Sequence, residues 1–165
     1  MEIVNDTYYI YCDMDGVLAD FDKLYTKYSG GVQPSIYRKK YGHEAFWATI
    51  EDAGEKFWSS MEWMPDGKKL YNYIKPYDPI LLSSFPKIPS RNLAVSGKIK
   101  WINKHLDTKN YEFVKKQDKK LFSQKNRILI DDNANTIKEW NSKGGIGILH
   151  TNANATIKKL KELGL

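Results

Sequence analysis

The sequence predicts an α/β fold, in which a Rossmann-like, doubly wound parallel sheet carries a small helical insertion after its first strand. Short apolar runs alternate with amphipathic segments along most of the chain, which is typical of parallel strands joined by helices. Residues from about 22 to 75 interrupt this alternation with many aromatic side chains and no convincing strand. We therefore expect one domain across residues 1–165, with a core of residues 1–21 and 76–165 and a helical cap of about 22–75.

The strands are expected where short apolar runs are bounded by glycines or polar turns. These runs are residues 8–13, 80–83, 111–114, 127–131 and 146–150. Helices are expected at residues 99–106, 133–142 and 156–163. In the last of them Ile157, Leu160 and Leu163 form an apolar face, so its lysines are expected to form a solvated face.

Two carboxylates end the first strand. Asp13 and Asp15 lie one residue apart at the end of an apolar, aromatic-rich run, and Gly16 follows at once. Like charges this close repel each other, and each loses hydration on burial. A cation between them relieves both costs, and hard oxygen ligands of this kind suit Mg²⁺. An acidic turn that only caps the strand is the alternative for this pattern taken alone.

A second apolar run closes on the adjacent carboxylates Asp131 and Asp132. In an open parallel sheet the C-terminal ends of the strands line one crevice, where ligands bind, so both acid pairs are expected in one metal site. A strand between them in the sequence ends in Ser83 and Ser84. The lysines that precede the second acidic run are Lys115, Lys116, Lys119, Lys120 and Lys125. Acid pair, hydroxyl, lysine and acid pair, in this order, indicate a phosphoryl-transfer site.

These motifs resemble the four motifs of the haloacid dehalogenase superfamily of phosphohydrolases. The run from Asp13 to Phe21 is similar, residue for residue, to the first motif of the 5'(3')-deoxyribonucleotidases within that superfamily. The resemblance implies a fold in which a cap inserted after the first strand closes over the site and selects the substrate. It also implies a hydrolase of phosphoric monoesters that uses Mg²⁺ and acts on nucleoside monophosphates, above all pyrimidine deoxyribonucleoside monophosphates.

The constellation assigns a role to each group. Asp13 is expected to attack phosphorus and form an aspartyl-phosphate, while Mg²⁺ screens the approach of the anionic substrate. Asp15 is expected to protonate the leaving oxygen and then to activate the hydrolytic water. Ser83, with Ser84 as the less favoured choice, is expected to donate to a phosphoryl oxygen. Lys119 is expected to offset the charge that develops in the transition state.

Two further lysines, Lys120 and Lys125, compete with Lys119 for this role. Lys119 is preferred because Asp118-Lys119 resembles the third motif of the superfamily. Two more residues than in that motif separate Lys119 from Asp131, so the choice among the three lysines stays open.

The metal is expected to bind Asp13, the backbone carbonyl of Asp15 and an acid of the second pair. Of Asp131 and Asp132, one is expected to bind Mg²⁺ directly and the other to hold a metal-bound water. Adjacent residues of a strand face opposite ways, so the turn must rotate one of them inward. The resemblance favours Asp132 as the direct ligand.

Substrate recognition is expected from a few aromatic side chains of the insertion. Most of its aromatics are expected to form its own core, since a small helical unit needs large side chains to be stable. The others should stack on a nucleobase. Phe21 lies one helical turn past the acidic loop, and its match to the deoxyribonucleotidase motif implies substrate contact. Phe46-Trp47 resembles a Phe-Trp pair in the cap of those enzymes, and Phe57-Trp58 is the alternative pair.

Composition excludes several classes of protein. No apolar stretch approaches the ~20 residues that span a bilayer, and residues 1–6 lack the profile of a signal peptide. The single cysteine, Cys12, excludes an internal disulfide, which fits a reducing cytoplasm. Cys12 is expected to pack in the core rather than to act as a reactive thiol. The three histidines show no metal-ligand spacing.

The net charge of +6 suits an anionic substrate, and it also suits nucleic acid. One alternative function is therefore a 3'-phosphatase that acts on nucleic-acid ends, although a lidded site would hinder entry of a polymer. Another is a nucleic-acid-binding module with a vestigial site, which the retention of every chemical group disfavours. We expect a small-molecule nucleotide as the partner, with neither membrane nor nucleic acid, and leave a homodimer open.

Overall fold

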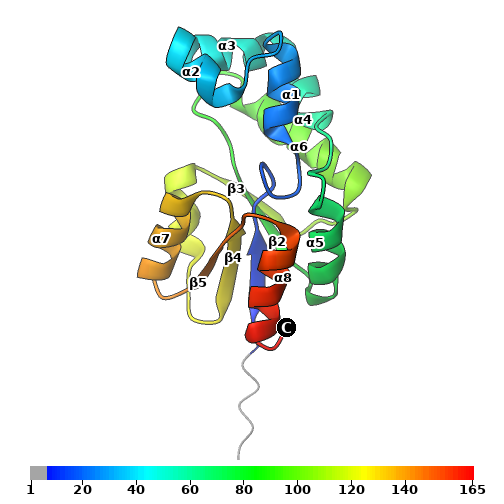
Figure 1. Ribbon diagram of the computed structural model, residues 1–165, viewed down its shortest axis with the longest axis vertical. Coiled ribbons are helices and arrows are strands. Elements are labelled where there is room, and N and C mark those ends of the chain that lie inside the picture. Colours follow the sequence, from blue (N-terminus) through cyan, green and yellow to red (C-terminus); the bar gives the residue numbers. More distant parts are fainter. Residues whose placement is uncertain (1–6) are drawn as a thin grey trace, which may run out of the picture.

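Five parallel strands form one sheet in the computed structural model, which describes residues 7–165 (Figure 1). Residues 1–6, to which the expected lack of a signal peptide refers, lie outside the described part. The strands are β1 (Tyr9–Cys12), β2 (Ile80–Ser84), β3 (Tyr111–Val114), β4 (Arg127–Asp131) and β5 (Ile146–Leu149). Their order is β3-β2-β1-β4-β5, and every neighbouring pair is parallel. The predicted fold class and strands are therefore confirmed.

Strand β1 lies at the centre of the sheet, where the direction of winding reverses. The chain moves outward from β1 through β2 to β3 and then crosses to β4 on the other side of β1. Ligands of open α/β sheets bind at such a reversal, beyond the carboxyl ends of the two strands. The ends of β1 and β4 carry Asp13 and Asp131, so the acid pairs meet at this point.

Helices cover both faces of the sheet, because the strands present apolar side chains to each face. One face, with Ile10 and Cys12, packs against α5 (Gly67–Ile74), α6 (Arg91–His105) and α8 (Ala153–Glu162). The other face packs against α7 (Ala134–Ser142) and the 3₁₀ helix η2 (Lys116–Phe122). Figure 1 shows α7 on one side of the sheet and α5 and α8 on the other.

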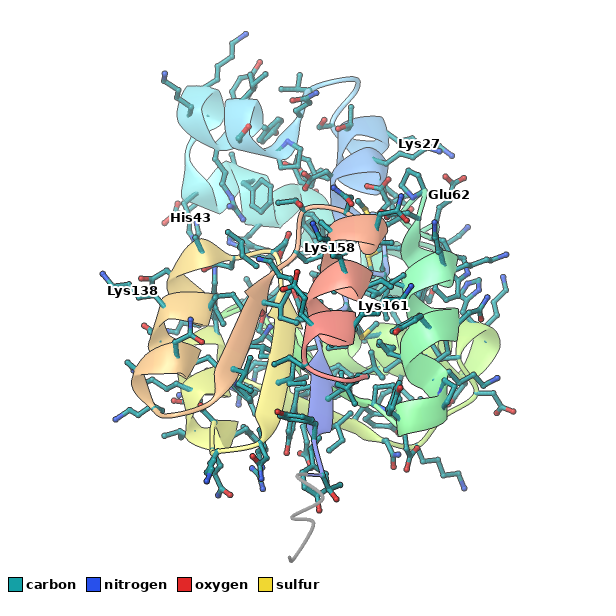
Figure 2. All side chains as sticks on the ribbon, turned by 60° about the horizontal axis from the view of Figure 1, so that its bottom comes forward. Lys27, His43, Glu62, Lys138, Lys158 and Lys161 are labelled. Atoms are coloured by element: carbon teal, nitrogen blue, oxygen red, sulfur yellow. The ribbon has the colours of Figure 1, made fainter. Side chains whose placement is uncertain are left out.

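Helix ends follow local capping signals where the sequence offers them. The side chains of Asn133 and Asn152 accept hydrogen bonds from Thr136 N and Ala155 N and so cap α7 and α8. Helix α8 keeps Lys158 and Lys161 exposed, in agreement with the predicted solvated face (Figure 2). Cys12 is fully buried, and burial raises the pKa of its thiol, as expected of a core residue.

Four helices of the insertion lie beyond the carboxyl ends of the strands (Figure 1). They are α1 (Phe21–Tyr28), α2 (Pro34–Tyr41), α3 (His43–Ala53) and α4 (Glu55–Ser59). Their core is aromatic: the rings of Tyr25 and Phe46 stack at 4.4 Å between centroids, and Phe57 is fully buried. This large apolar area stabilises helices that are individually too short to persist alone.

Helix α5 returns from the insertion to the sheet. It packs beside α8, and the Tyr73 hydroxyl donates to the carbonyl oxygen of Leu165 at 2.7 Å. A short 3₁₀ helix η1 (Lys75–Tyr77) then leads into β2. The division into a core and a cap at residues 22–75 stays a prediction. Helix α5 falls within that range but packs against α8 of the core. Among the described residues, no helix is both long and apolar enough to cross a membrane.

Candidate active site

Strand β1 places Asp13 in the centre of the crevice, where the residue is only 7% exposed. A tight turn follows, in which Gly16 N donates to the carbonyl oxygen of Ala19 at 2.9 Å. Gly16 has a φ of 81°, a conformation that glycine adopts without the strain that a side chain would add. Asp15 lies just before this turn and lines the same crevice as Asp13.

Lys119 joins the two acidic strand ends. Its Nζ lies 3.0 Å from Asp13 Oδ1 and 2.8 Å from Asp131 Oδ2, and the side chain is 4% exposed. Burial alone would lower the pKa of Lys119, but the carboxylates of Asp13 and Asp131 raise it above its ordinary value. The ammonium is therefore charged at neutral pH. Lys120 and Lys125 do not line this crevice, so the geometry singles out Lys119 among the three.

The two acids of the second pair have different surroundings. Asp131 is buried, and its two oxygens accept hydrogen bonds from Lys119 Nζ and from Asn133 N, the latter at 2.9 Å. Asp132 is the more exposed residue of the two, and its carboxylate lies against Gly16. A Cβ atom at Gly16 would lie 2.1 Å from Asp132 Oδ2, so the approach requires glycine at that position.

Three carboxylates converge closely enough to hold one metal ion. Oxygens of Asp13, Asp131 and Asp132 all lie within 4.8 Å of one another. Loss of hydration and the negative charge of Asp13 raise the pKa of Asp131 to about 6 and that of Asp132 to about 8. A divalent cation would stabilise the charged forms, and an all-oxygen donor set suits Mg²⁺. The residues present therefore fit the expected metal.

Lys98 contacts the other half of the site. Its Nζ donates to Asp15 Oδ2 at 3.0 Å, to Ser83 Oγ at 2.9 Å and to the Ser84 carbonyl oxygen at 2.7 Å. Burial raises the pKa of Asp15, whereas the charge of Lys98 opposes this shift and that of Asp13 adds to it. The expected hydroxyl and the expected acid–base group thus share one buried ammonium.

A cavity of about 520 Å³ opens above the acids and extends to the insertion. Its lining includes Phe21, Trp47 and Trp58 from the insertion. The Trp47 Nε1 atom donates to His43 Nε2 at 3.1 Å. His43, the first residue of α3, lies at the edge of the insertion that faces α7 in Figure 2 and lines the same cavity. A cavity of about 610 Å³ between α1 and α4 contains none of the paired acids.

No protein-family model matches the chain, and no curated protein matches it. Solved structures match it over most of its length. A hydrolase from Streptococcus pneumoniae TIGR4 has a TM-score of 0.59 and 13% identity, with 94% of this chain and 99% of that chain covered. A candidate phosphatase from Clostridium difficile has a TM-score of 0.56 and 13% identity, covering 96% and 99%. A haloacid dehalogenase-like family hydrolase from Xanthomonas campestris has a TM-score of 0.54 and 10% identity, covering 93% and 85%.

The chain has the haloacid dehalogenase-like fold. In this chain the fold gathers most of the residues that the sequence singled out. The predicted site residues that line the 520 Å³ cavity are Asp13, Asp15, Phe21, Trp47, Ser84, Lys119, Asp131 and Asp132. Ser83 is buried beneath it and joins the site through Lys98. Phe46 is not brought to the cavity, because it is 0% exposed within the aromatic core of the insertion.

Sequence reasoning missed Lys98 and Arg38 in this site. Lys98 lies on the buried face of α6 together with Ala94, Trp101 and Ile102. Helical periodicity traced backward from Trp101 would have placed a charged residue on an apolar face, which is the available signal. Arg38 lines the cavity and lies 3.9 Å from the centre of the Phe46 ring, a contact that depends on how α2 meets α3.

Proposed function

We propose that this protein is a Mg²⁺-dependent phosphomonoesterase that hydrolyses nucleoside monophosphates, with pyrimidine deoxyribonucleotides as the leading candidates. The observation that carries the proposal is the buried Lys119 ammonium between Asp13 and Asp131, at the ends of two neighbouring strands. A fixed positive charge beside a buried carboxylate suits reactions in which negative charge builds up on a phosphoryl group. The hydrolase and phosphatase among the structural neighbours support the same class of reaction.

Asp13 is proposed as the nucleophile. Lys119 holds its Oδ1, which fixes the carboxylate in the crevice. In the first step an Asp13 oxygen forms a bond to phosphorus while the bond from phosphorus to the leaving oxygen breaks. In the second step water attacks the aspartyl-phosphate, the new phosphorus–oxygen bond to Asp13 breaks, and inorganic phosphate leaves.

Asp15 is proposed to move the proton in both steps. It donates a proton to the leaving oxygen in the first step and takes one from the attacking water in the second, so the two steps balance. Its raised pKa makes the protonated form accessible. Ser83, and Ser84 at the cavity wall, are proposed to donate hydrogen bonds to phosphoryl oxygens.

Asp13, Asp132 and the backbone carbonyl of Asp15 are proposed to hold the metal. Asp132 is favoured over Asp131 as a direct ligand, because both oxygens of Asp131 already accept hydrogen bonds from Lys119 and Asn133. When bound, Mg²⁺ would supply charge neutralisation for an anionic substrate that approaches several carboxylates.

The aromatic wall of the cavity supports a substrate that carries a base. Phe21, Trp47 and Trp58 line it from the side of the insertion. Aromatic faces bind nucleobases by stacking and need no particular hydrogen-bonding edge. Phe46 is withdrawn from this proposal, since its ring is buried in the insertion.

A second candidate, a phosphatase of nucleic-acid 3' ends, is favoured by the basic rim of the cavity. Lys87, Lys115 and Lys116 line the cavity and are exposed. Exposed lysines of this kind attract further phosphates of a polymer. The four helices beyond the strand ends would restrict a polymer, so we rank this candidate second.

One experiment separates these candidates. Phosphate release with Mg²⁺ would be measured across nucleoside monophosphates, sugar phosphates and 3'-phosphorylated oligonucleotides, with Asp13→Asn measured in parallel. We expect the highest kcat/KM on a deoxynucleoside monophosphate. Preference for the oligonucleotides would support the second candidate. Absence of Asp13-dependent release from every substrate would contradict both.

A further inference from the structure

Lys98 is a fully buried cation whose hydrogen bonds all end in the active site. Its side chain is 1% exposed, and an ammonium group has three donors. These three go to the carboxylate of Asp15, the hydroxyl of Ser83 and the carbonyl oxygen of Ser84, at 3.0, 2.9 and 2.7 Å. Burial of a lysine is costly unless its charge is paired and its donors are satisfied. Both conditions are met here, and only by groups of the site.

The two oxygens of Asp15 are consequently different. Oδ2 accepts the hydrogen bond from Lys98. Oδ1 is buried and is the one buried side-chain nitrogen or oxygen atom without a hydrogen-bond partner in the described part of the chain. Buried acceptors rarely stay unsatisfied, and those that do often lie where a ligand or water binds. The contact with Lys98 therefore occupies Oδ2 and fixes the direction of the carboxylate, while Oδ1 is left without a partner among the described residues.

The position of Lys98 is fixed by close packing between α6 and α4. A Cβ atom at Gly97 would lie 2.6 Å from both the Glu55 carbonyl oxygen and Trp58 Cβ, so only glycine permits this approach. The approach brings the Trp58 ring to 5.0 Å from Lys98 Nζ. Strand β2 supplies the two serines on the other side. The ammonium is thus enclosed between the insertion and the sheet.

We infer that Lys98 is a positioning residue of the hydrolytic reaction: it clamps one oxygen of Asp15 so that the other faces the leaving group of the substrate. It acts through Asp15 and Ser83 and need not touch the substrate. This inference rests on the proposed phosphomonoesterase function. It adds to that function a second lysine, whose task differs from that of Lys119 beside the nucleophile.

Leaving-group dependence distinguishes this role from a purely structural one. Hydrolysis of 4-nitrophenyl phosphate releases a stable anion that needs no proton, whereas phenyl phosphate releases a more basic oxygen that does. Release of the phenol would be measured in a single turnover, with enzyme in excess, so that only the first step is observed. Lys98→Met removes the charge and keeps a similar side-chain volume.

We expect Lys98→Met to slow the first turnover of phenyl phosphate by about 10- to 100-fold, part of what a general acid contributes, and that of 4-nitrophenyl phosphate by less than about threefold. Lys98→Arg should recover part of the loss on phenyl phosphate. The matched control is Lys100→Met, on the same helix, where the lysine is exposed and pairs with Glu55. It should leave both rates unchanged.

Folding is monitored by circular dichroism and thermal unfolding. If Lys98→Met does not fold, Lys98→Gln serves instead, because it keeps a hydrogen-bond donor without the charge, and the same difference between substrates is expected. Equal losses on both esters in a folded variant would overturn the inference while leaving the proposed function intact. No Asp13-dependent hydrolysis by the wild type would overturn the proposed function and the inference together.

Discussion

Buried carboxylates at the ends of β1 and β4 stay tolerable because each has a specific partner. Lys119 lies between Asp13 and Asp131, and Lys98 contacts Asp15. Among residues 7–165, no ammonium pairs with Asp132, which instead lies against Gly16. Removing one partner of a buried ion pair generally lowers the stability of a protein by more than the intact pair adds to it, because the other charge stays buried without a partner. Single substitutions in this site should therefore have large and distinguishable effects.

Gly16→Ala should weaken metal binding. The added Cβ would collide with Asp132 Oδ2, and a φ of 81° would strain any residue with a side chain. Gly144→Ala is the matched control, because its φ is 95° and, apart from its chain neighbours, no described residue lies within 4 Å of the added Cβ. Gly144→Ala should lose about 1 kcal/mol of unfolding free energy from backbone strain alone, and Gly16→Ala should lose more, because the collision with Asp132 adds to the same strain. Only Gly16→Ala should lose the stabilisation by Mg²⁺ in thermal unfolding; equal responses would contradict the contact.

Stability without metal should fall as the pH rises. The pKa values of Asp131 and Asp132 are raised to about 6 and about 8, so the folded protein keeps protons that the unfolded chain releases near pH 3.8. This contribution is complete below that pH and is lost as the pH passes through 6 and then 8. Mg²⁺ needs the deprotonated carboxylates, so its stabilising effect should grow over the same range.

Thermal unfolding in a chelator and in Mg²⁺, measured at several pH values from 5 to 9, checks this prediction. The difference in melting temperature between the two conditions should increase steadily with pH. A difference that is independent of pH would mean that these two acids do not titrate in the metal-free protein.

Which lysine lies beside Asp13 could not be settled from the sequence. Lys119, Lys120 and Lys125 share one short segment, and only the 3₁₀ helix η2 turns the first of them into the crevice. Such a helix places side chains by local turns rather than by an apolar pattern, so periodicity carries no signal for it. The different contacts of the Asp131 and Asp132 carboxylates likewise depend on the turn after β4.

At the scale of elements, the insertion contributes one aromatic residue from each of its two Phe-Trp pairs to the cavity. Trp47 and Trp58 line it, whereas Phe46 and Phe57 are fully buried in the insertion. Neighbouring residues of a helix point in different directions, so a dipeptide can serve the core and the cavity at once. The prediction that Phe46 and Trp47 both contact the substrate overlooked this division.

Trp47→Ala should cost about 1–3 kcal/mol on a nucleotide substrate, roughly ten- to a hundredfold in kcat/KM, because a stacking surface is lost. Its effect on an aryl phosphate without a base should be smaller, since the phosphoryl machinery is untouched. Phe46→Ala is the contrast: it leaves a hole in the insertion and should lower activity on both substrates together with stability. Steady-state kinetics on both esters would reveal equal losses for Trp47→Ala if that residue only supports the fold.

The strands could be predicted because short apolar runs and terminal acids are local signals. Helix α6 was expected from residue 99 but begins at Arg91. Gly97 and Lys98 lie just before residue 99, and because neither is apolar, the sequence pattern there does not indicate a buried helix. Their burial depends on α4, which the chain brings from far away in sequence. For the same reason the contact between the insertion and α6 could not be foreseen.

For the whole molecule, the sheet topology explains why residues from both ends of the sequence form one site. Order β3-β2-β1-β4-β5 places the ends of β1, β2 and β4 side by side under the insertion (Figure 1). The net charge of +6 adds a field that attracts anionic substrates over longer distances. The attraction should weaken with salt, whereas the buried contacts should not.

Activity should depend absolutely on the metal. Chelation should stop turnover, and Mg²⁺ should restore it. Ca²⁺ should inhibit, because its larger and looser coordination disturbs the in-line geometry. Phosphate release in each condition is the measurement, and full activity in Ca²⁺ alone would be incompatible with the proposed site.

The most direct test of the account is the rate of phosphate release by Asp13→Asn. The amide matches the carboxylate in shape but cannot act as the nucleophile, so we predict a loss of at least ~10³-fold with the fold intact. Asp107→Asn, the same chemical change at an exposed position after α6, should leave the rate unchanged. Activity of Asp13→Asn within tenfold of the wild type, in protein free of wild-type contamination, would contradict catalysis through Asp13.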